Sequence, residues 1–386
     1  MRKLRIAYFA GTMKPGQDGV TRVLFKLLDW LNSNEIDNMF VTAITPNDDE
    51  QTTKYLRVPS VQFPLYKEYK FALPGYKNFQ EEILKFKPDI IHINSPCSLG
   101  FAAVKFGEKF QIPVVATYHT HFPSYAKYYK ISQLEALSWS YLRKLYNRCE
   151  KVYVPSLPIL DELHNHGFTT AEYLSHGVDT KVFNPSFKSD EWKTSLGIKD
   201  KKVILYIGRL VWEKDLKTFT EIYSQIMSNR NDTVFVLAGD GPIRSELEEL
   251  MPEAIFLGYQ SGNKLSTIFA SSDVFLFPST TETFGNVIIE AMASGIPPVC
   301  ARMGGTYGSV NDNVNGLICN PKDAKDFSQK INYLLDNDEI RKQMSISGIK
   351  YAKEQSWENK FTQLYESYFE AILNYGKRKA QPTLAA

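Results

Sequence analysis

The chain has 386 residues, of which 43% are hydrophobic and 23% charged, and its formal net charge is +2. Its length suits two domains, and its nearly balanced charge argues against binding of nucleic acid through bulk positive charge. No apolar run approaches the roughly 20 residues that a membrane-spanning helix needs, and the 4 cysteines are scattered without a Cys-x-x-Cys pair. We therefore expect a globular protein of the reducing cytoplasm, with neither a disulfide framework nor a zinc site.

Short apolar runs alternate with longer helical patterns along the whole chain. The runs that we expect to form strands are 4–10, 39–45, 89–94, 113–119, 151–155, 202–208, 233–239, 254–259, 273–279, 297–302 and 316–320. Strands that are apolar on both faces and separated by helices predict parallel sheets with right-handed crossovers. The fold class is therefore α/β, with two doubly wound, Rossmann-like domains.

The turn-rich stretch 176–192 predicts the boundary between these domains. We place the first domain at residues 1–185 and the second at 186–359. The helical pattern at the end of the chain predicts a last helix over about residues 360–376, and a disordered tail at 377–386. In doubly wound domains ligands bind at the carboxyl ends of the strands, so the site is expected in a cleft between the two sheets.

The segment TETFGNVIIE (281–290) follows an expected strand and opens an expected helix. The N–H groups that open this helix come from Phe284, Gly285, Asn286 and Val287. Free N–H groups at a helix start bind anions. Glu282 and Glu290 flank this anion site and are suited to accept hydrogen bonds from hydroxyls, as a nucleoside diphosphate linked to a sugar would offer. The alternative is a solvated loop glutamate and a first-turn glutamate that complements the helix dipole.

A pair of cations follows the expected strand 202–208 in GRLVWEKDLKTF (208–219). Arg209 and Lys214 lie before or at the start of a helix, where the dipole disfavours positive charge, so we expect an external anion there. A diphosphate would satisfy both side chains, because Arg can bind phosphate oxygens bidentately and Lys adds a point charge. The alternative is two ordinary surface cations.

Two glycine-containing turns also follow strands, PGQDGVTR (15–22) and AGDGP (238–242). Gly16 and Gly19 allow the backbone to come close to a ligand, although such a turn can equally do no more than connect a strand to a helix. Neither turn matches the Gly-x-Gly-x-x-Gly fingerprint of dinucleotide binding.

Two histidines end the expected strand 113–119 in TYHTHFPSY (117–125). His119 should project into the cleft, where it could exchange hydrogen bonds with a sugar hydroxyl. No third metal-ligating residue lies near His119 and His121 in the sequence, so we expect no metal ion. His92 is interpreted as a core or second-layer histidine rather than a ligand.

The segment 127–151 combines apolar residues at helical spacing with an excess of basic residues. Such a helix could rest on anionic lipid, or it could simply cover its own sheet. Contact with the inner face of a membrane is therefore kept as an alternative to a purely cytoplasmic location.

With GRL and EK inside 208–214 and the two glutamates of TETFGNVIIEAMASG, the chain resembles the retaining glycosyltransferases of family 4. The resemblance covers nearly the whole length, including SHGVDTKVFNP (175–185). In the first half, DGVTR (18–22) and FKPDIIHINSP (86–96) are most similar to mannosyl- and sulfoquinovosyl-transferases that act on lipids. The resemblance implies a GT-B fold, with the acceptor bound by the first domain and the donor by the second.

The resemblance also implies roles for individual residues. Arg209 and Lys214 would bind the donor diphosphate and neutralise the leaving group. Glu290 would hold the ribose, and Glu282 the hydroxyls of the transferred sugar. His119 would contact that sugar near its 6-position, so His119, Arg209, Lys214 and Glu282 are the candidate catalytic residues. The remaining donor contacts would come from Gly19, Tyr259, Thr283, Phe284, Gly285, Asn286 and Val287.

The implied reaction is transfer of a hexose from a nucleotide-diphosphate sugar to a lipid or glycan hydroxyl, with no metal and no cofactor other than this co-substrate. Electrostatic stabilisation of the departing diphosphate would supply most of the rate. The donor stays open between GDP-mannose and UDP-hexoses. The alternatives are a nucleotide-sugar epimerase of the same fold and a nicotinamide-dependent oxidoreductase, against which the absent glycine fingerprint argues.

Overall fold

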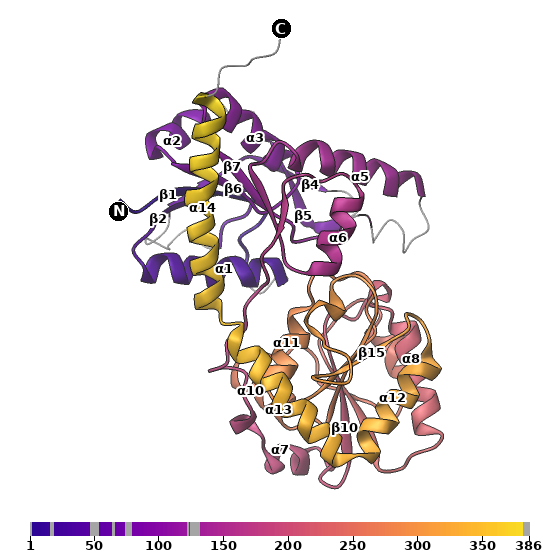
Figure 1. Cartoon of the computed structure of the whole chain (residues 1–386). Coiled ribbons are helices and arrows are strands. Elements are labelled where there is room, and N and C mark those ends of the chain that lie inside the picture. Colours follow the sequence, from indigo (N-terminus) through magenta and orange to yellow (C-terminus); the bar gives the residue numbers. More distant parts are fainter. Residues whose placement is uncertain are drawn as a thin grey trace.

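The computed structural model describes residues 2–15, 19–46, 54–63, 66–73, 79–121, 123 and 132–380. They form two domains, one above the other in Figure 1, each built on a parallel sheet with helices on both faces. The α/β fold with two Rossmann-like domains, expected from the alternation of apolar runs and helical patterns, is confirmed. No helix among the described residues is long and apolar enough to cross a bilayer.

The first domain holds a seven-stranded sheet in the order β3-β2-β1-β6-β7-β8-β9. Its strands are β1 (Arg5–Ala10), β2 (Asp37–Thr42), β3 (Lys54–Arg57), β6 (Ile90–Ile93), β7 (Val114–Thr117), β8 (Lys151–Val154) and β9 (Ala171–Tyr173). A separate antiparallel pair consists of β4 (Ser60–Phe63) and β5 (Tyr66–Ala72). The helices are α1 (Gly19–Ser33), α2 (Phe79–Phe86), α3 (Ser98–Phe110), α5 (Ser132–Tyr146) and α6 (Leu157–Asn165). The sequence pattern missed β3, β4, β5 and β9, which are short or carry polar residues.

The second domain holds a six-stranded sheet in the order β12-β11-β10-β13-β14-β15. Its strands are β10 (Lys202–Ile207), β11 (Thr233–Ala238), β12 (Ile255–Phe256), β13 (Val274–Phe277), β14 (Pro298–Ala301) and β15 (Leu317–Cys319), and each lies within an expected run. Its helices are α7 (Asp190–Ser195), α8 (Leu216–Met227), α9 (Arg244–Leu250), α10 (Gly262–Ala270), α11 (Asn286–Ala293), α12 (Ala324–Asp336) and α13 (Asp338–Glu354). Short 3-10 turns are η1 (Pro185–Phe187), η2 (Trp212–Lys214) and η3 (Thr306–Ser309).

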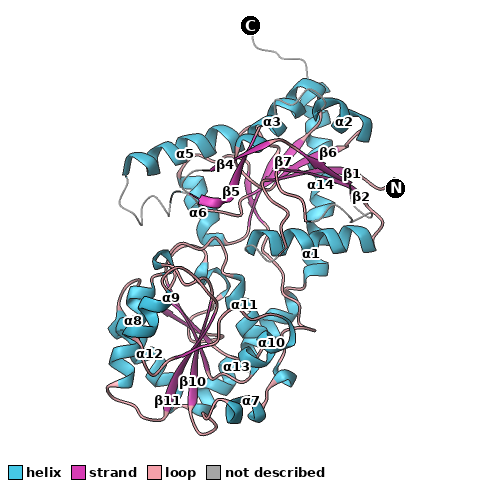
Figure 2. Ribbon diagram, turned by 180° about the vertical axis from the view of Figure 1, so that it is seen from behind, coloured by secondary structure: helices cyan, strands magenta, loops and turns pink. Residues whose placement is uncertain are grey.

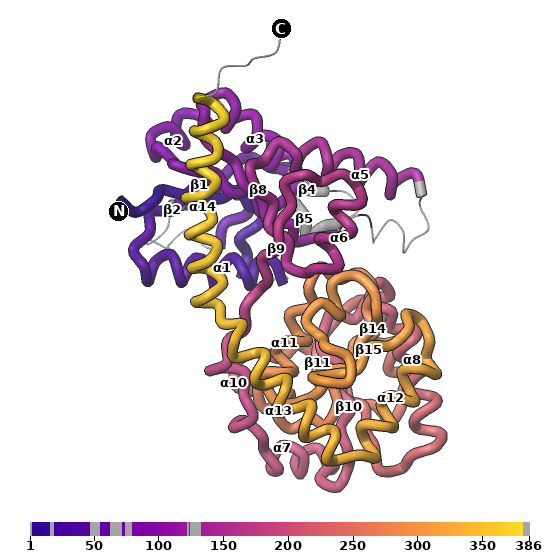
Figure 3. Tube along the Cα trace, viewed as in Figure 1, coloured from indigo at the N-terminus to yellow at the C-terminus, as the bar shows by residue number. Residues whose placement is uncertain are grey.

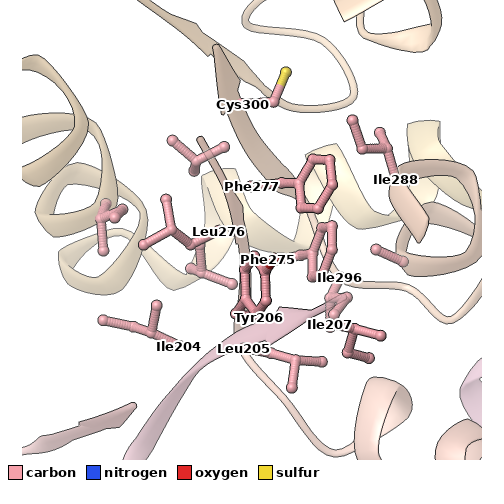
Figure 4. Packing of buried hydrophobic residues seen from close by; sticks show 14 of the residues in the cluster. Ile204, Leu205, Tyr206, Ile207, Phe275, Leu276, Phe277, Ile288, Ile296 and Cys300 are labelled. Carbon is pink, nitrogen blue, oxygen red and sulfur yellow. The ribbon is translucent and has the colours of Figure 1, made fainter. Parts of the chain in front are cut away.

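Aromatic stacking organises the core of the second domain. Phe277 stacks on Tyr206 at 5.9 Å and on Phe275 at 5.7 Å between ring centroids, as Figure 4 shows beside Ile288 and Ile296. All four residues of β13 are buried, because helices cover both faces of the sheet. This explains why the strand is apolar throughout rather than alternating.

The chain crosses between the domains twice, and the two crossings lie side by side. The N–H of Val178 donates to the carbonyl of Gln355 at 2.8 Å, and Val178 and Ser356 form a parallel bridge. A Cβ on Gly177 would lie 2.6 Å from the backbone nitrogen of Trp357. Only glycine allows this approach, so the crossings form one narrow joint.

The last helix, α14 (Trp357–Ala380), returns to the first domain and lies along it in Figures 1 to 3. Its buried residues are Phe361, Leu364, Tyr368 and Ala371. The helix continues through Ala380, so the expectation of a disordered tail was wrong for residues 377–380. Basic residues complement the dipole of the last turn, and Arg378 forms an ion pair with Glu150 of the first domain. Residues 381–386 lie outside the described residues.

The hydroxyl of Tyr368 anchors α14 to the first sheet. It lies 2.6 Å from Nδ1 of His92 and 3.3 Å from the hydroxyl of Tyr8, and all three side chains are buried. The other ring nitrogen of His92, Nε2, lies 2.7 Å from the hydroxyl of Thr117. Burial lowers the pKa of His92 to about 3, so the ring is neutral. The interpretation of His92 as a core histidine is confirmed.

We expect Tyr368→Phe to lower the free energy of unfolding of the first domain by about 1–3 kcal/mol, because it leaves a buried ring nitrogen of His92 without its partner. Urea unfolding followed by tryptophan fluorescence measures this change. Leu373→Ala, on the exposed side of the same helix, is the control and should change stability by less than about 0.5 kcal/mol. Equal stability of the Tyr368→Phe variant and the wild type would contradict the assignment.

Candidate active site

Three loops of the second domain lie at the carboxyl ends of neighbouring strands β11, β10 and β13. The first two interlock through glycines. A Cβ on Gly239 would lie 1.9 Å from the carbonyl oxygen of Gly208, and one on Gly241 would lie 2.2 Å from that of Leu210. The loop AGDGP, which sequence reasoning could not separate from an ordinary connection, therefore supports the loop that carries Arg209.

The loop before α11 rests on a second pair of glycines that sequence reasoning missed. The N–H of Gly305 donates to the carbonyl of Glu282 at 2.6 Å, and a Cβ on Gly305 would lie only 1.8 Å from the carbonyl oxygen of Thr283. Gly304 has a φ of +60°, which favours glycine. A Gly-Gly pair directly after the expected strand 297–302 was the signal that could have found it.

The start of α11 has the geometry expected for an anion site. Gly285 precedes the helix with a φ of 76°, and the helix begins at Asn286, so its first N–H groups point out of the amino end. Phe284 is buried, with its ring 5.1 Å from that of His176, while Asn286 and Val287 are partly exposed. Oδ1 of Asn286 lies 2.9 Å from Nδ1 of His176 on the first crossing. His176 is a contact that sequence reasoning missed.

Lys214 and Glu282 form an ion pair with each other. The hydroxyl of Ser279 also lies 3.5 Å from the same carboxylate oxygen. Lys214 therefore has a carboxylate partner within the chain, which the sequence did not predict, and binding of an external diphosphate by Lys214 stays a prediction. Arg209 differs, since it is exposed and forms no ion pair with any described carboxylate. The charge of Lys214 is thus balanced by Glu282, whereas the charge of Arg209 is not balanced by any described carboxylate.

Asp215 fixes the position of Lys214, and sequence reasoning missed it. It has a φ of 55°, and its buried carboxylate accepts hydrogen bonds from the N–H of Thr280, at 3.0 Å, and from the Thr280 hydroxyl. Burial raises the pKa of Asp215, while these hydrogen bonds act in the opposite direction. The turn of Lys214 is thereby tied to the loop of Glu282.

Glu290 lies one turn inside α11 and contacts the first domain. Its Oε1 accepts a hydrogen bond from Nη1 of Arg22 at 3.1 Å, and its side chain is only 8% exposed. Its Oε2 is buried without a hydrogen-bond partner among the described residues. Burial raises the pKa of Glu290, and the positive charge of Arg22 opposes that increase.

His119 lies at the junction of the domains rather than in an open cleft. It is buried, its Nε2 lies 3.1 Å from Oδ1 of Asn94, and its Nδ1 has no partner among the described residues. Burial, with a further effect from His176, lowers its pKa well below the ordinary value. A neutral ring of this kind can accept a hydrogen bond through Nδ1 when Nε2–H donates to Asn94.

Thr283 also joins the domains. Its hydroxyl donates to the carbonyl of His119 at 2.8 Å, and its own carbonyl accepts from the hydroxyl of Ser156 at 2.7 Å. Its backbone carbonyl and side-chain hydroxyl are therefore engaged by the first domain. Sequence reasoning had no signal for Ser156.

The remaining candidates lie around these loops. A Cβ on Gly19 would lie 3.9 Å from Nδ2 of Asn286, so the start of α1 faces the start of α11. Tyr259 follows β12 and is 67% exposed, so its ring is accessible for stacking. Gly16 lies outside the described residues. Near His121, Nε2 lies 3.2 Å from Glu162, and no group of three or more potential metal ligands occurs within the described part of the chain.

The fold has counterparts among known proteins. Residues 17–182 match the family model "Glycosyltransferase Family 4", and residues 188–351 match "Glycosyl transferases group 1". The crystal structure of Anabaena HepE in complex with UDP and glucose superposes with a TM-score of 0.74 at 16% identity, covering 95% of this chain and 99% of that chain. The protein thus has the GT-B fold of two facing Rossmann-like domains.

Curated relatives are similar to this protein over most of its length. A GDP-mannose-dependent alpha-mannosyltransferase of Corynebacterium glutamicum is 32% identical over 96% of this chain and 90% of that protein. The sulfoquinovosyl transferase SQD2 of Arabidopsis thaliana is 34% identical over 82% of this chain and 63% of that protein. An alpha-monoglucosyldiacylglycerol synthase of Streptococcus pneumoniae is 26% identical over 82% of this chain and 75% of that protein. The chain belongs to glycosyltransferase family 4, and it transfers a sugar from a nucleotide sugar.

We expect Gly305→Ala to weaken nucleotide binding and to reduce sugar transfer by about 100-fold. The added Cβ must displace the carbonyl of Thr283 and with it the loop of Glu282, and shifts of about 1 Å in a positioning loop have costs of this size. Calorimetry with UDP and GDP, followed by a transfer assay, measures both effects. Gly376→Ala is the control, because a Cβ there meets nothing within 4 Å. Normal affinity and turnover in Gly305→Ala would show that the loop tolerates the shift.

Proposed function

We propose that the enzyme transfers a hexose from GDP-mannose or a UDP-hexose to a hydroxyl of a lipid or glycan, with retention of anomeric configuration and without a metal ion. One observation carries the proposal. The exposed cation Arg209, the pair Lys214–Glu282 and the start of α11 are held together by Asp215 and by the glycines of neighbouring loops. Two cations and a helix start next to carboxylates suit a diphosphate that carries a sugar.

The ion pair between Lys214 and Glu282 supports a specific role for each partner. When a diphosphate binds, Lys214 gains a more highly charged anion, and Glu282 is released to accept hydrogen bonds from the transferred sugar. Both side chains are largely buried. If either one were lost, the other would remain as a buried charge without its partner, which is unfavourable. The ion pair thus gives each of these two side chains a partner before the donor binds.

The donor would extend along both sides of α11. Its diphosphate would lie at Arg209, Lys214 and the backbone of Gly285 to Val287, with the backbone of Gly19 close by. Tyr259 would stack on the base, and Glu290 would hold the ribose. His119 would accept a hydrogen bond from the transferred sugar through Nδ1, which lacks another described partner.

In the proposed reaction the bond between the anomeric carbon and the diphosphate oxygen breaks first, and its electron pair leaves with the nucleotide. Positive charge at Arg209 and Lys214 stabilises the departing diphosphate, and this electrostatic effect is the main source of rate. The acceptor oxygen then bonds to the anomeric carbon on the face that the leaving group vacates. Its proton passes to the departing phosphate, so no side chain needs to act as a strong base.

A lipid acceptor is supported by the surface of α5. Leu134, Leu137 and Tyr141 form an exposed apolar stripe on this helix, while Trp139 and Leu142 on its other side are buried. Arg143 and Lys144 are exposed in its last turn. An apolar stripe next to basic residues suits the surface of an anionic bilayer. Residues 127–131, the other part of this basic segment, lie outside the described residues.

The function is tested with a panel of UDP- and GDP-linked sugars, without and with lipid acceptors and in the presence of a chelator. We expect one nucleotide sugar to be hydrolysed slowly alone and used rapidly with its acceptor, with the α-linked product that retention requires. Conversion of the sugar without any acceptor would favour an epimerase. Dependence on an added metal ion would contradict the proposed mechanism.

We expect Arg209→Ala to lower kcat by about 100- to 1,000-fold, the usual cost of removing one group that stabilises charge in a transition state. The melting temperature should not change, because Arg209 is exposed and forms no ion pair among the described residues. Lys325→Ala, which removes an exposed lysine of α12, is the control and should keep normal turnover. Full turnover of Arg209→Ala would remove this residue from the mechanism.

We expect Leu134→Ser combined with Leu137→Ser to weaken binding to vesicles of phosphatidylcholine and phosphatidylglycerol by about tenfold or more, because each lost side chain gives up about 1.5–3 kcal/mol of burial. Co-sedimentation with vesicles measures the change. Ile346→Ser removes an equally exposed apolar residue from α13 of the second domain and should have no effect. If both proteins bind the vesicles equally, α5 only covers its own sheet.

A further inference from the structure

One face of α1 points toward the donor domain and its crossing. Gly19, Arg22 and Lys26 follow one another at spacings of three and four residues, which places them on one side of a helix. Gly19 lies opposite Asn286, Arg22 contacts Glu290 at 3.1 Å, and Lys26 forms an ion pair with Asp179 at 3.0 Å. The opposite face is buried in the first domain. The face of α1 that carries Gly19, Arg22 and Lys26 therefore contacts the second domain and the crossing.

The contact with Glu290 uses only half of the carboxylate. Oε1 accepts the hydrogen bond from Arg22, while Oε2 is buried and has no hydrogen-bond partner among the described residues. An unpartnered buried carboxylate oxygen is unfavourable, and a native structure that keeps one commonly reserves it for a ligand or water. Glu290 thus has one oxygen held by the protein and one that lacks a partner.

We propose that Arg22 is a positioning residue for the donor: it holds Glu290 through one carboxylate oxygen so that the other accepts a hydrogen bond from a ribose hydroxyl. The inference rests on the proposed function, because it takes the ligand to be a nucleotide. It adds that the first domain also acts on the donor indirectly, through a residue that does not touch the donor itself.

The burial of Oε2 sets a condition for binding. Oε2 of Glu290 is covered by the protein, so a ribose hydroxyl reaches it only when the groups that cover it move. The hydrogen bond from Arg22 to Oε1 would keep the carboxylate in its orientation during that movement.

A purely structural role predicts something different. If Arg22 only held the two domains together, its loss would change the affinity for every ligand of the cleft by the same factor. A positioning role changes only the part of the affinity that depends on ribose hydroxyls. Comparison of a nucleotide with its analogue lacking those hydroxyls separates the two roles.

The experiment measures, by calorimetry, the affinity for UDP and GDP and for the 2′,3′-dideoxy form of whichever binds more tightly. The ratio of the two affinities is the ribose preference. It is determined for the wild type, Arg22→Gln, Arg22→Lys, Glu290→Gln and Lys26→Gln. Lys26→Gln is the matched control, because it removes the other ion pair of the same helix face but no hydrogen bond of Glu290. Arg22 and Lys26 are both substantially exposed, so their variants should fold.

We expect Arg22→Gln and Glu290→Gln to reduce the ribose preference by about tenfold or more, the usual value of a hydrogen bond to a charged group. Arg22→Lys should restore part of it, and Lys26→Gln should leave it within about twofold.

A normal ribose preference in Arg22→Gln, with a reduced one in Glu290→Gln, would overturn the inference and leave the proposed function intact. An equal loss in Lys26→Gln would also overturn it. If the wild type binds neither nucleotide, the proposed function itself fails.

Discussion

The loop between β13 and α11 is held by both domains, and the arrangement of the cleft depends on this. The hydroxyl of Thr283 donates a hydrogen bond to the carbonyl of His119, and the carbonyl of Thr283 accepts one from the hydroxyl of Ser156. Gly305 of the second domain approaches the same carbonyl so closely that no side chain fits at position 305. Since Glu282 and the start of α11 flank Thr283, a shift between the domains must move both of them. The positions of these candidate site residues in the second domain therefore depend on the first domain.

The charges at the candidate site are largely paired with one another. Lys214 pairs with Glu282 and Glu290 with Arg22, while Arg209 is exposed to solvent without an ion-pair partner among the described residues. Lys214, Glu282 and Glu290 are largely buried, and a buried charge without a partner is unfavourable. The internal pairs avoid that cost, whereas the exposed Arg209 does not need one.

The sequence was sufficient for the features that depend on neighbouring residues. Each expected strand overlaps an observed one, although β2 begins at Asp37, two residues before the expected run 39–45, and the helix start at Asn286 follows from the local pattern. What could not be predicted depends on residues far apart in the chain. Arg22 and Glu290 are separated by 268 positions, and Ser156 and Thr283 by 127. The partner of a charged residue leaves no local pattern, so the partner of Lys214, 68 positions away, was also missed. The same holds for Arg378, in the part of the last helix that was not expected, which pairs with Glu150, 228 positions earlier.

The joint between the domains shows how these long-range contacts are distributed along α11. The two crossings lie against each other at Gly177 and Trp357, so both connections between the domains pass through one narrow region. His176 lies on the first crossing and contacts Asn286, whereas Arg22 reaches Glu290 from the surface of α1. The start of α11 is therefore held by the joint, while the glutamate one turn further along the same helix is held by the body of the first domain.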